Sequence, residues 1–208
     1  MAHASAIPYL EEKNKIKING GVPHPYGSIA VIGPGTGLGM SFGFFDFEKN
    51  KYVFHPSEGG NRIAAGADDK QLSIISKILK KCSFVRWEDL ISGQGIKNIY
   101  EALFDEIKPT EEIMHGLQKE AKSIEAFDMV CGFLGLFARN VADIFLCSGG
   151  IYIIGGIFSR KENLEFLKKS SFMSYYNITL PKGSPYLENY PITVVTEENL
   201  ALTGLANL

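Results

Sequence analysis

A glycine-rich loop that follows an apolar run constrains this chain more than any other part of its sequence. Residues 28–32 read Ser-Ile-Ala-Val-Ile, the pattern of a buried strand, and Gly-Pro-Gly-Thr-Gly-Leu-Gly follows at 33–39. Glycines at alternate positions remove every second Cβ, so the backbone can adopt positive φ and point successive N–H groups at one anion. Thr36 adds a hydroxyl donor at the tip. The loop can therefore wrap a phosphate group.

The spacing of these glycines excludes two common nucleotide-binding loops. A dinucleotide fingerprint needs glycine at i, i+2 and i+5, but Leu38 or Met40 occupies the third place in either register, and the Gly-Lys-Ser/Thr of a Walker loop is missing. The residues after the loop indicate antiparallel strands at 40–47 and 51–54 with a turn at 48–50. The loop is thus the tip of a hairpin. Because such tips are often only tight turns, this segment alone leaves both a phosphate site and a simple turn open.

Three further motifs combine glycine turns with carboxylates or apolar runs. Glu-Gly-Gly-Asn at 58–61 ends the third strand, and Trp-Glu-Asp-Leu-Ile-Ser-Gly-Gln-Gly at 87–95 places a second carboxylate before another glycine turn. An apolar run at 151–157 contains a glycine pair. Taken singly, Glu58 and Glu88 are better explained as exposed loop carboxylates. The order and spacing of the motifs, taken together, favour a binding role for both carboxylates instead.

In this order, the four motifs resemble those of the bacterial-type glucokinase family, of the actin/hexokinase/Hsp70 ATPase fold. The resemblance runs from about residue 6 to the C-terminus and covers the later two-thirds of the family's chain. It implies an α/β protein: the ribonuclease H-like large domain of that fold, a mixed sheet with helices on both faces, with the N-terminal small domain missing. The implied organisation is a residual helix and linker at 1–25, the sugar- and nucleotide-binding domain at 26–188, and a strand and helix at 189–208 that would pack on the small domain.

The resemblance implies a sugar site made of Glu58, Glu88 and Asn61. Ionised carboxylates only accept hydrogen bonds, and each can take two from neighbouring sugar hydroxyls, which suits this role. The family usually has a histidine after Glu-Gly-Gly, whereas Asn61 is shorter and never charged. We therefore expect glucose or another hexose as ligand, with an altered affinity or sugar preference.

The resemblance also implies that Gly35, Thr36 and Gly37 contact the transferred phosphates of ATP and that Gly155 and Gly156 pass close to the adenosine. Mg²⁺ would arrive with the nucleotide rather than in a cage of protein ligands. His55 and Glu58 have a spacing that could suit a metal, but no third ligand is evident in the sequence. The expected ligands are thus ATP with Mg²⁺, and no protein-bound metal is expected.

The family's catalytic aspartate and its first phosphate loop precede the region at which this chain begins, so we expect the base just before Met1 and none within these residues. Asp46, Asp68 and Asp69 are the acids near the relevant segments, and nothing in the sequence brings them to the sugar. The expected function is ATP-dependent phosphorylation of glucose at the 6-hydroxyl, the first step of glycolysis, with this chain inactive alone. The alternative is a non-catalytic truncated paralogue that binds sugar or nucleotide.

Composition agrees with a cytoplasmic enzyme. The 208 residues are 45% hydrophobic and 21% charged with a formal net charge of −2, so no basic face suggests a nucleic acid partner. The three cysteines have no C-x-x-C spacing and indicate a reducing compartment. The apolar stretch 127–158 is interrupted by Arg139, Asn140 and Asp143, so it predicts a helix, a turn and a strand rather than a membrane span.

The remaining periodicities predict short amphipathic elements. Ser123 is the expected cap of the long helix, with Glu125 in its first turn. Further elements are expected as helices around 72–79 and 96–104, strands at 151–154 and 192–195, a loop at 181–185 and a last helix opening at 197. We expect that last helix and the segment Ile7–Leu10 to have lost the surface that covers them in the family, and hence self-association or a requirement for an N-terminal domain.

Overall fold

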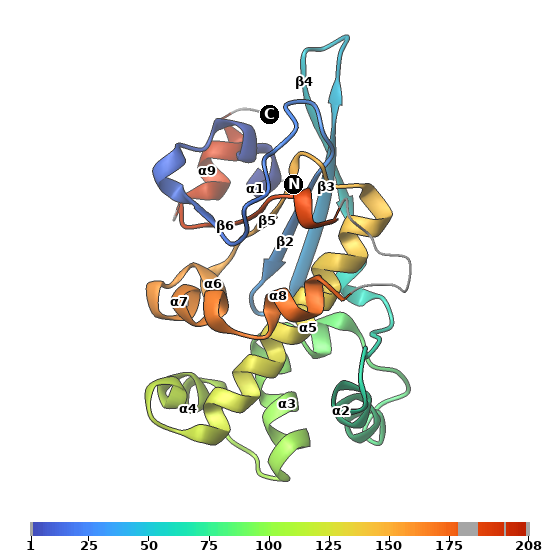
Figure 1. The fold of residues 1–208 in the computed structure, drawn as a ribbon, viewed down its shortest axis with the longest axis vertical. Helices are drawn as coiled ribbons and strands as arrows, with labels where there is room; N and C mark the ends of the chain where they lie inside the picture. Colours follow the sequence, from blue (N-terminus) through green and yellow to red (C-terminus); the bar gives the residue numbers. More distant parts are fainter. Residues whose placement is uncertain (1, 179–186, 198, 207–208) are drawn as a thin grey trace.

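The computed structural model describes residues 2–178, 187–197 and 199–206, and it is built on one mixed sheet (Figure 1). The order of the six strands is β1-β6-β5-β2-β3-β4. Their bounds are β1 Lys15–Lys17, β2 Ile29–Pro34, β3 Leu38–Asp46, β4 Lys51–Ser57, β5 Gly150–Ile153 and β6 Ile192–Val195. Strand β5 runs parallel to both β2 and β6, and the other pairs are antiparallel. The predicted hairpin and strands are therefore confirmed.

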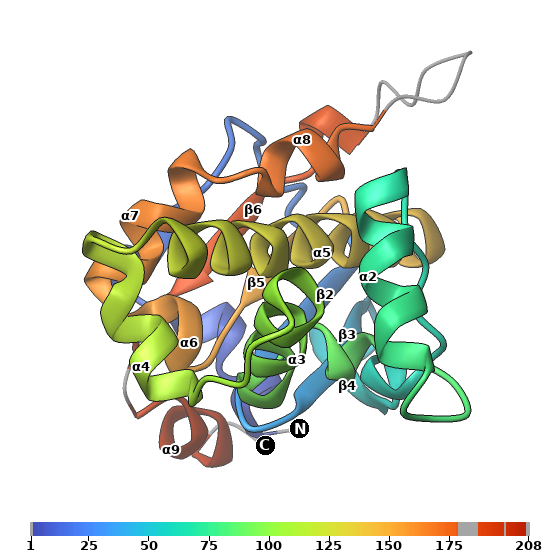
Figure 2. The ribbon, with the colours of Figure 1, turned by 90° about the horizontal axis from the view of Figure 1, so that it is seen from below.

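Helices occupy most of the remaining described chain. The α-helices are α1 Ala2–Ser5, α2 Asp69–Leu79, α3 Gly93–Phe104, α4 Thr110–His115, α5 Ala121–Phe145, α6 Gly156–Ser159, α7 Lys161–Lys169, α8 Phe172–Tyr176 and α9 Leu200–Leu205. Short 3-10 helices are η1 Ile7–Tyr9, η2 Glu12–Asn14, η3 Gly59–Asn61, η4 Trp87–Asp89, η5 Gly116–Gln118 and η6 Leu187–Asn189. The long helix α5 crosses one side of the molecule, with α2 and α3 beside it (Figure 2). None of the helices in the described ranges combines the length and apolarity that a bilayer crossing requires.

The two faces of the sheet bury separate apolar clusters, and β2 contributes to both. Ala30 and Ile32 join the larger cluster, which includes buried side chains of α3 and α5. Ile29 and Val31 belong to the smaller cluster on the other face. This alternation follows from the two-residue period of a strand that is covered on both sides. The fold is therefore the expected α/β arrangement of a mixed sheet between two helical layers.

The first and last helices cover the second face together, which corrects one expectation. Ile7 and Leu10 are buried against the sheet beside Leu200 of α9, and α1 packs against α9 (Figure 1). The expectation that Ile7–Leu10 is left uncovered is wrong, because the last helix supplies the missing cover. Leu202 and Leu205 of α9 do remain exposed. Leu208 and the loop predicted at 181–185 lie outside the described residues.

Two predicted helix starts are also wrong. Helix α5 begins at Ala121, because the carbonyl of Glu120 already accepts a hydrogen bond from the Ile124 amide. Ser123 consequently lies buried inside the helix and donates its hydroxyl to the Glu120 carboxylate at 3.0 Å instead of capping the end. Helix α9 begins at Leu200, three residues later than predicted, since the Glu197 carboxylate accepts hydrogen bonds from Asn14 and the Asn199 amide.

Candidate functional site

The glycine loop is the closed end of the β2–β3 hairpin. Pro34 pairs with Leu38, and the Gly35 amide donates to the Gly37 carbonyl at 2.8 Å. The expectation of positive φ is wrong, since throughout this fully described loop no glycine lies in the left-handed region. The absence of a side chain matters at Gly37 and not at Gly35. A Cβ on Gly37 would lie 2.5 Å from the Glu88 carboxylate, whereas a Cβ on Gly35 would meet nothing within 4 Å.

A cavity of about 560 Å³ opens beside the tip of this loop. Gly35 and Thr36 line it together with the start of α3, whose Gly93 amide donates to the Gly35 carbonyl at 2.9 Å. Ser92 caps this helix by accepting a hydrogen bond from the Gly95 amide. A helix N-terminus carries partial positive charge, so the wall next to the glycine loop favours an anion.

The opposite wall of the cavity comes from the segment that follows β5. Gly156 and Arg160 line the cavity, and a Cβ on Gly156 would meet nothing within 4 Å. Gly155 has φ +97°, and a Cβ there would lie 2.7 Å from the Pro34 carbonyl, so only glycine lets the chain turn this close to the hairpin. The predicted residues Gly35, Thr36 and Gly156 thus share one cavity, while Gly155 shapes it. Arg160 was missed, because a lone arginine after an apolar run carries no sequence signal.

The residues predicted to hold a sugar contact one another through a pairing of two segments near the same hairpin. Residues 62–64 pair with residues 85–87 through an isolated bridge and two backbone hydrogen bonds. This pairing brings Asn61 to Arg86, which donates to the Asn61 amide oxygen at 3.0 Å and lies 3.2 Å from a Glu88 oxygen. Asn61 in turn donates to Glu58 at 2.7 Å. Arg86, which sequence reasoning missed, therefore connects all three predicted residues.

Glu88 joins this group to the glycine loop. Its second carboxylate oxygen accepts a hydrogen bond from the Leu38 amide at 2.9 Å, directly after Gly37. Gly37 therefore lies against Glu88 and not among the residues that line the cavity, whereas Gly35 and Thr36 on the same loop do line it. The glycine loop thus lies between the cavity and the residues predicted to bind sugar.

Arg86 is held by a neighbouring carboxylate. Its Nε and Nη2 donate to the two oxygens of Asp89 at 3.1 and 2.7 Å. Hydrogen bonding to Asp89 raises the pKa of the Arg86 guanidinium. Burial opposes ionisation of Asp89, but the hydrogen bonds from the Arg86 side chain and backbone outweigh it and lower the pKa of Asp89. Both groups are therefore charged at neutral pH.

Other acids of the chain are engaged elsewhere. Asp46 accepts hydrogen bonds from the Glu48 and Lys49 amides in the β3–β4 turn, and Asp68 caps α2 through the Gln71 amide. Asp69 is the first residue of α2. Within the described ranges there is no group of three or more His, Cys, Asp or Glu side chains that could hold a metal ion.

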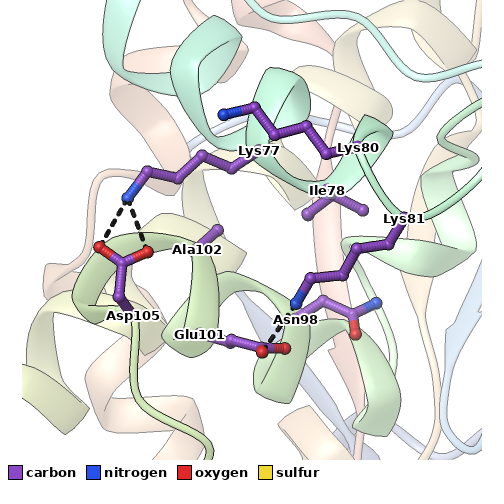
Figure 3. A pocket seen from close by; sticks show the side chains of 8 residues that line it. All are labelled: Lys77, Ile78, Lys80, Lys81, Asn98, Glu101, Ala102 and Asp105. Carbon is purple, nitrogen blue, oxygen red and sulfur yellow. Dashed lines mark hydrogen bonds and ion pairs between the residues drawn. The ribbon is translucent and has the colours of Figure 1, made fainter.

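A separate cavity of about 260 Å³ lies between α2 and α3 (Figure 3). Its charged side chains largely satisfy one another: Lys77 pairs with Asp105 at 3.3 Å and Lys81 with Glu101 at 2.7 Å. These ion pairs join the two helices. The cavity contains none of the predicted site residues, so we assign it to packing between α2 and α3.

Comparison with known proteins identifies relatives along the whole chain. The family model described as Glucokinase matches residues 1–208. The Bifunctional protein glk of Paraburkholderia xenovorans is 34% identical over 215 residues, covering 99% of this chain and 33% of that protein. The Glucokinase of Nitrobacter hamburgensis is 33% identical over 219 residues, covering 100% of this chain and 66% of that protein. The chain therefore spans about a third of the first relative and about two-thirds of the second.

Solved structures share the fold over the same extent. A glucokinase from an Antarctic psychrotroph superposes with a TM-score of 0.90 at 27% identity, covering 99% of this chain and 65% of that chain. A ROK family glucokinase from Streptomyces griseus, solved in complex with glucose and AMPPNP, has a TM-score of 0.62 at 16% identity, covering 99% and 64%. The second likeness concerns the fold alone.

Proposed function

Because the chain belongs to the glucokinase family, we propose that it forms the hexose- and ATP-binding part of a kinase that phosphorylates glucose at the 6-hydroxyl, the first step of glycolysis. One observation carries this proposal. Glu88 accepts a hydrogen bond from the Leu38 amide at the glycine loop and also contacts Arg86 beside Asn61 and Glu58. A sugar held by these carboxylates would thus lie next to the loop that faces the phosphate cavity.

The cavity beside the hairpin suits a nucleotide with its phosphates. Gly35 and Gly156 leave two parts of its wall without a side chain, and Thr36 adds a hydroxyl donor. Arg160 and the start of α3 favour negative charge, and the Glu111 carboxylate, which also lines the cavity, opposes it. We infer that ATP binds here. Mg²⁺ held by the phosphates would neutralise their charge during transfer, which is the chemistry that this ion supplies to phosphoryl transfer.

The proton acceptor is proposed to come from a segment outside these 208 residues. Phosphoryl transfer uses a carboxylate that accepts the proton of the attacking hydroxyl. Glu58 and Glu88 are assigned to sugar binding, Asp89 is held by Arg86, and Asp46, Asp68 and Asp69 serve turns and helix starts. Lack of a general base typically slows a reaction about 10²–10⁴-fold. We therefore expect this chain alone to bind its ligands with little or no turnover.

The test is Mg²⁺- and ATP-dependent phosphorylation of glucose by the purified 208-residue chain, with Glu58→Ala as the control. We expect saturable glucose binding that Glu58→Ala weakens, and turnover only after the N-terminal third of a relative is added in trans. Turnover by the chain alone that Glu58→Ala abolishes would show that a base lies within it. Absence of glucose binding would refute the sugar site and favour a paralogue with another role.

The proposed partners extend beyond the two ligands. Leu202 and Leu205 on α9 are exposed apolar side chains, and we propose that they contact an N-terminal domain or a second copy of this chain. Sedimentation that shows only monomer at micromolar concentration would contradict the second possibility. Cys82, Cys131 and Cys147 are all thiols outside disulfides, which agrees with the proposed cytoplasmic location.

A further inference from the structure

Arg86 has a geometry that sets the orientation of its neighbours. Nε and Nη2 donate to the two oxygens of Asp89 in a bidentate arrangement, which fixes the plane of the guanidinium. Nη1 then carries two hydrogens in directions set by that plane. Nη1 donates to the Asn61 oxygen at 3.0 Å and forms an ion pair with a Glu88 oxygen 3.2 Å away.

The contact with Arg86 determines which way the Asn61 amide points. Arg86 has only donors, so it must face the amide oxygen, and the amide nitrogen must then lie on the other side. That nitrogen donates to Glu58 at 2.7 Å. Its second hydrogen is left for a ligand, because the described residues take only the first. Without Arg86, only the hydrogen bond to Glu58 would hold the amide, and rotation about that bond would change the direction of its second hydrogen.

We propose that Arg86 is a positioning residue for sugar binding, which orients the Asn61 amide as a hydrogen-bond donor and keeps Glu58 and Glu88 in register on either side of the hexose. The inference rests on the proposed sugar site. On this view, any sugar preference conferred by the uncharged Asn61 depends on Asp89 and Arg86 as well as on Asn61. A lysine cannot replace Arg86, since it has no planar fork to hold Asp89 and Nη1 contacts at once.

The single tryptophan of the chain provides the assay. Trp87 lies between Arg86 and Glu88, is 4% exposed and packs against Phe137 at 5.3 Å between ring centroids. Its emission should respond to occupancy of the adjacent carboxylates. Glucose is titrated into the full 208-residue chain and into Arg86→Met, Arg86→Lys, Asn61→Ala and the double variant Arg86→Met/Asn61→Ala. Arg62→Met is the matched control, because Arg62 is an exposed arginine on the paired segment.

If Arg86 acts through Asn61, Asn61→Ala should raise the glucose Kd about tenfold and Arg86→Met at least as much, because Arg86 also contacts Glu88. The double variant should be no weaker than Arg86→Met, since Asn61 contributes only when Arg86 orients it. Arg86→Lys should lose as much as Arg86→Met, and Arg62→Met should stay within about twofold of the parent chain. Thermal unfolding followed by circular dichroism identifies any variant that fails to fold. A variant with a lowered midpoint is compared at a temperature where it is folded.

Four outcomes would overturn the inference. Additive losses in the double variant would show that Arg86 does not act through Asn61. Full rescue by Arg86→Lys would show that charge, not the fork, matters. Unchanged affinity in Arg86→Met, with glucose bound by the parent chain, would refute the inference while leaving the proposed function intact. No glucose binding by the parent chain would refute both.

Discussion

Replacing Gly37 with alanine tests whether the proposed phosphate loop and the proposed sugar-binding carboxylates are coupled. The new Cβ would lie 2.5 Å from one Glu88 oxygen and 3.2 Å from its carboxyl carbon. Ordinary contact begins at 3.4 Å, so the carboxylate must retreat by about 0.9 Å. The same Glu88 oxygen accepts the hydrogen bond from the Leu38 amide at 2.9 Å, so its movement would weaken that bond. Gly37→Ala therefore displaces Glu88 without changing its chemistry.

The size of the effect follows from that displacement. A hydrogen bond to a charged group contributes about 1.5–3 kcal/mol, but water can replace this one because the Glu88 side chain is 30% exposed. We expect about 1 kcal/mol of lost unfolding free energy, toward the low end of what a hydrogen bond contributes. A carboxylate misplaced by nearly 1 Å should cost more in binding, roughly 10- to 100-fold in glucose Kd.

The assay is the Trp87 emission titration with glucose, together with urea unfolding. Gly35→Ala is the matched control, since it makes the same change in the same loop where a Cβ would meet nothing within 4 Å. Gly35→Ala should bind glucose like the parent chain, and any change in affinity should concern ATP. Equal glucose affinities for Gly37→Ala and Gly35→Ala would refute the coupling between the loop and Glu88.

Two further predictions concern titration. Asp89 has a folded pKa below its unfolded value of about 3.9, so it stabilises the fold above that value and loses this contribution as pH falls through the folded pKa. Asp89→Asn should therefore lower stability at pH 7 and flatten the acid limb of a stability–pH curve; an unchanged acid limb would contradict this. Burial raises the pKa of Cys147 to about 12 and also raises that of Cys131, whereas Cys82 is exposed. A thiol reagent at about pH 8 should titrate one thiol in the folded chain and three after denaturation, and rapid reaction of a second thiol before unfolding would count against the buried positions.

Features that depend on local spacing could be predicted from the sequence. The hairpin from β2 to β3 and the buried strand β5 follow from apolar runs bounded by glycines, and the body of α3 follows from its apolar periodicity over 96–104. The predicted cap at Ser123 and the predicted helix start at 197 are wrong. The Glu120 carbonyl begins α5 earlier, and Glu197 is held by the Asn199 amide and by the distant Asn14. From the sequence, positive φ is the expected reason for the loop glycines. At position 37 the reason for glycine is instead the Glu88 carboxylate, which lies 51 residues away in sequence.

The sequence by itself determined the motifs, their order and hence the family of this chain, because those properties reside in residue types and short spacings. Only the tertiary structure decided which residues meet. The pairing of residues 62–64 with 85–87 brings Arg86 to Asn61, and the return of the chain end as α9 covers Ile7 beside α1. Both contacts join segments that are far apart along the chain, and no local periodicity encodes them. The long-range packing of the sheet and its helices therefore brings the separate motifs into contact.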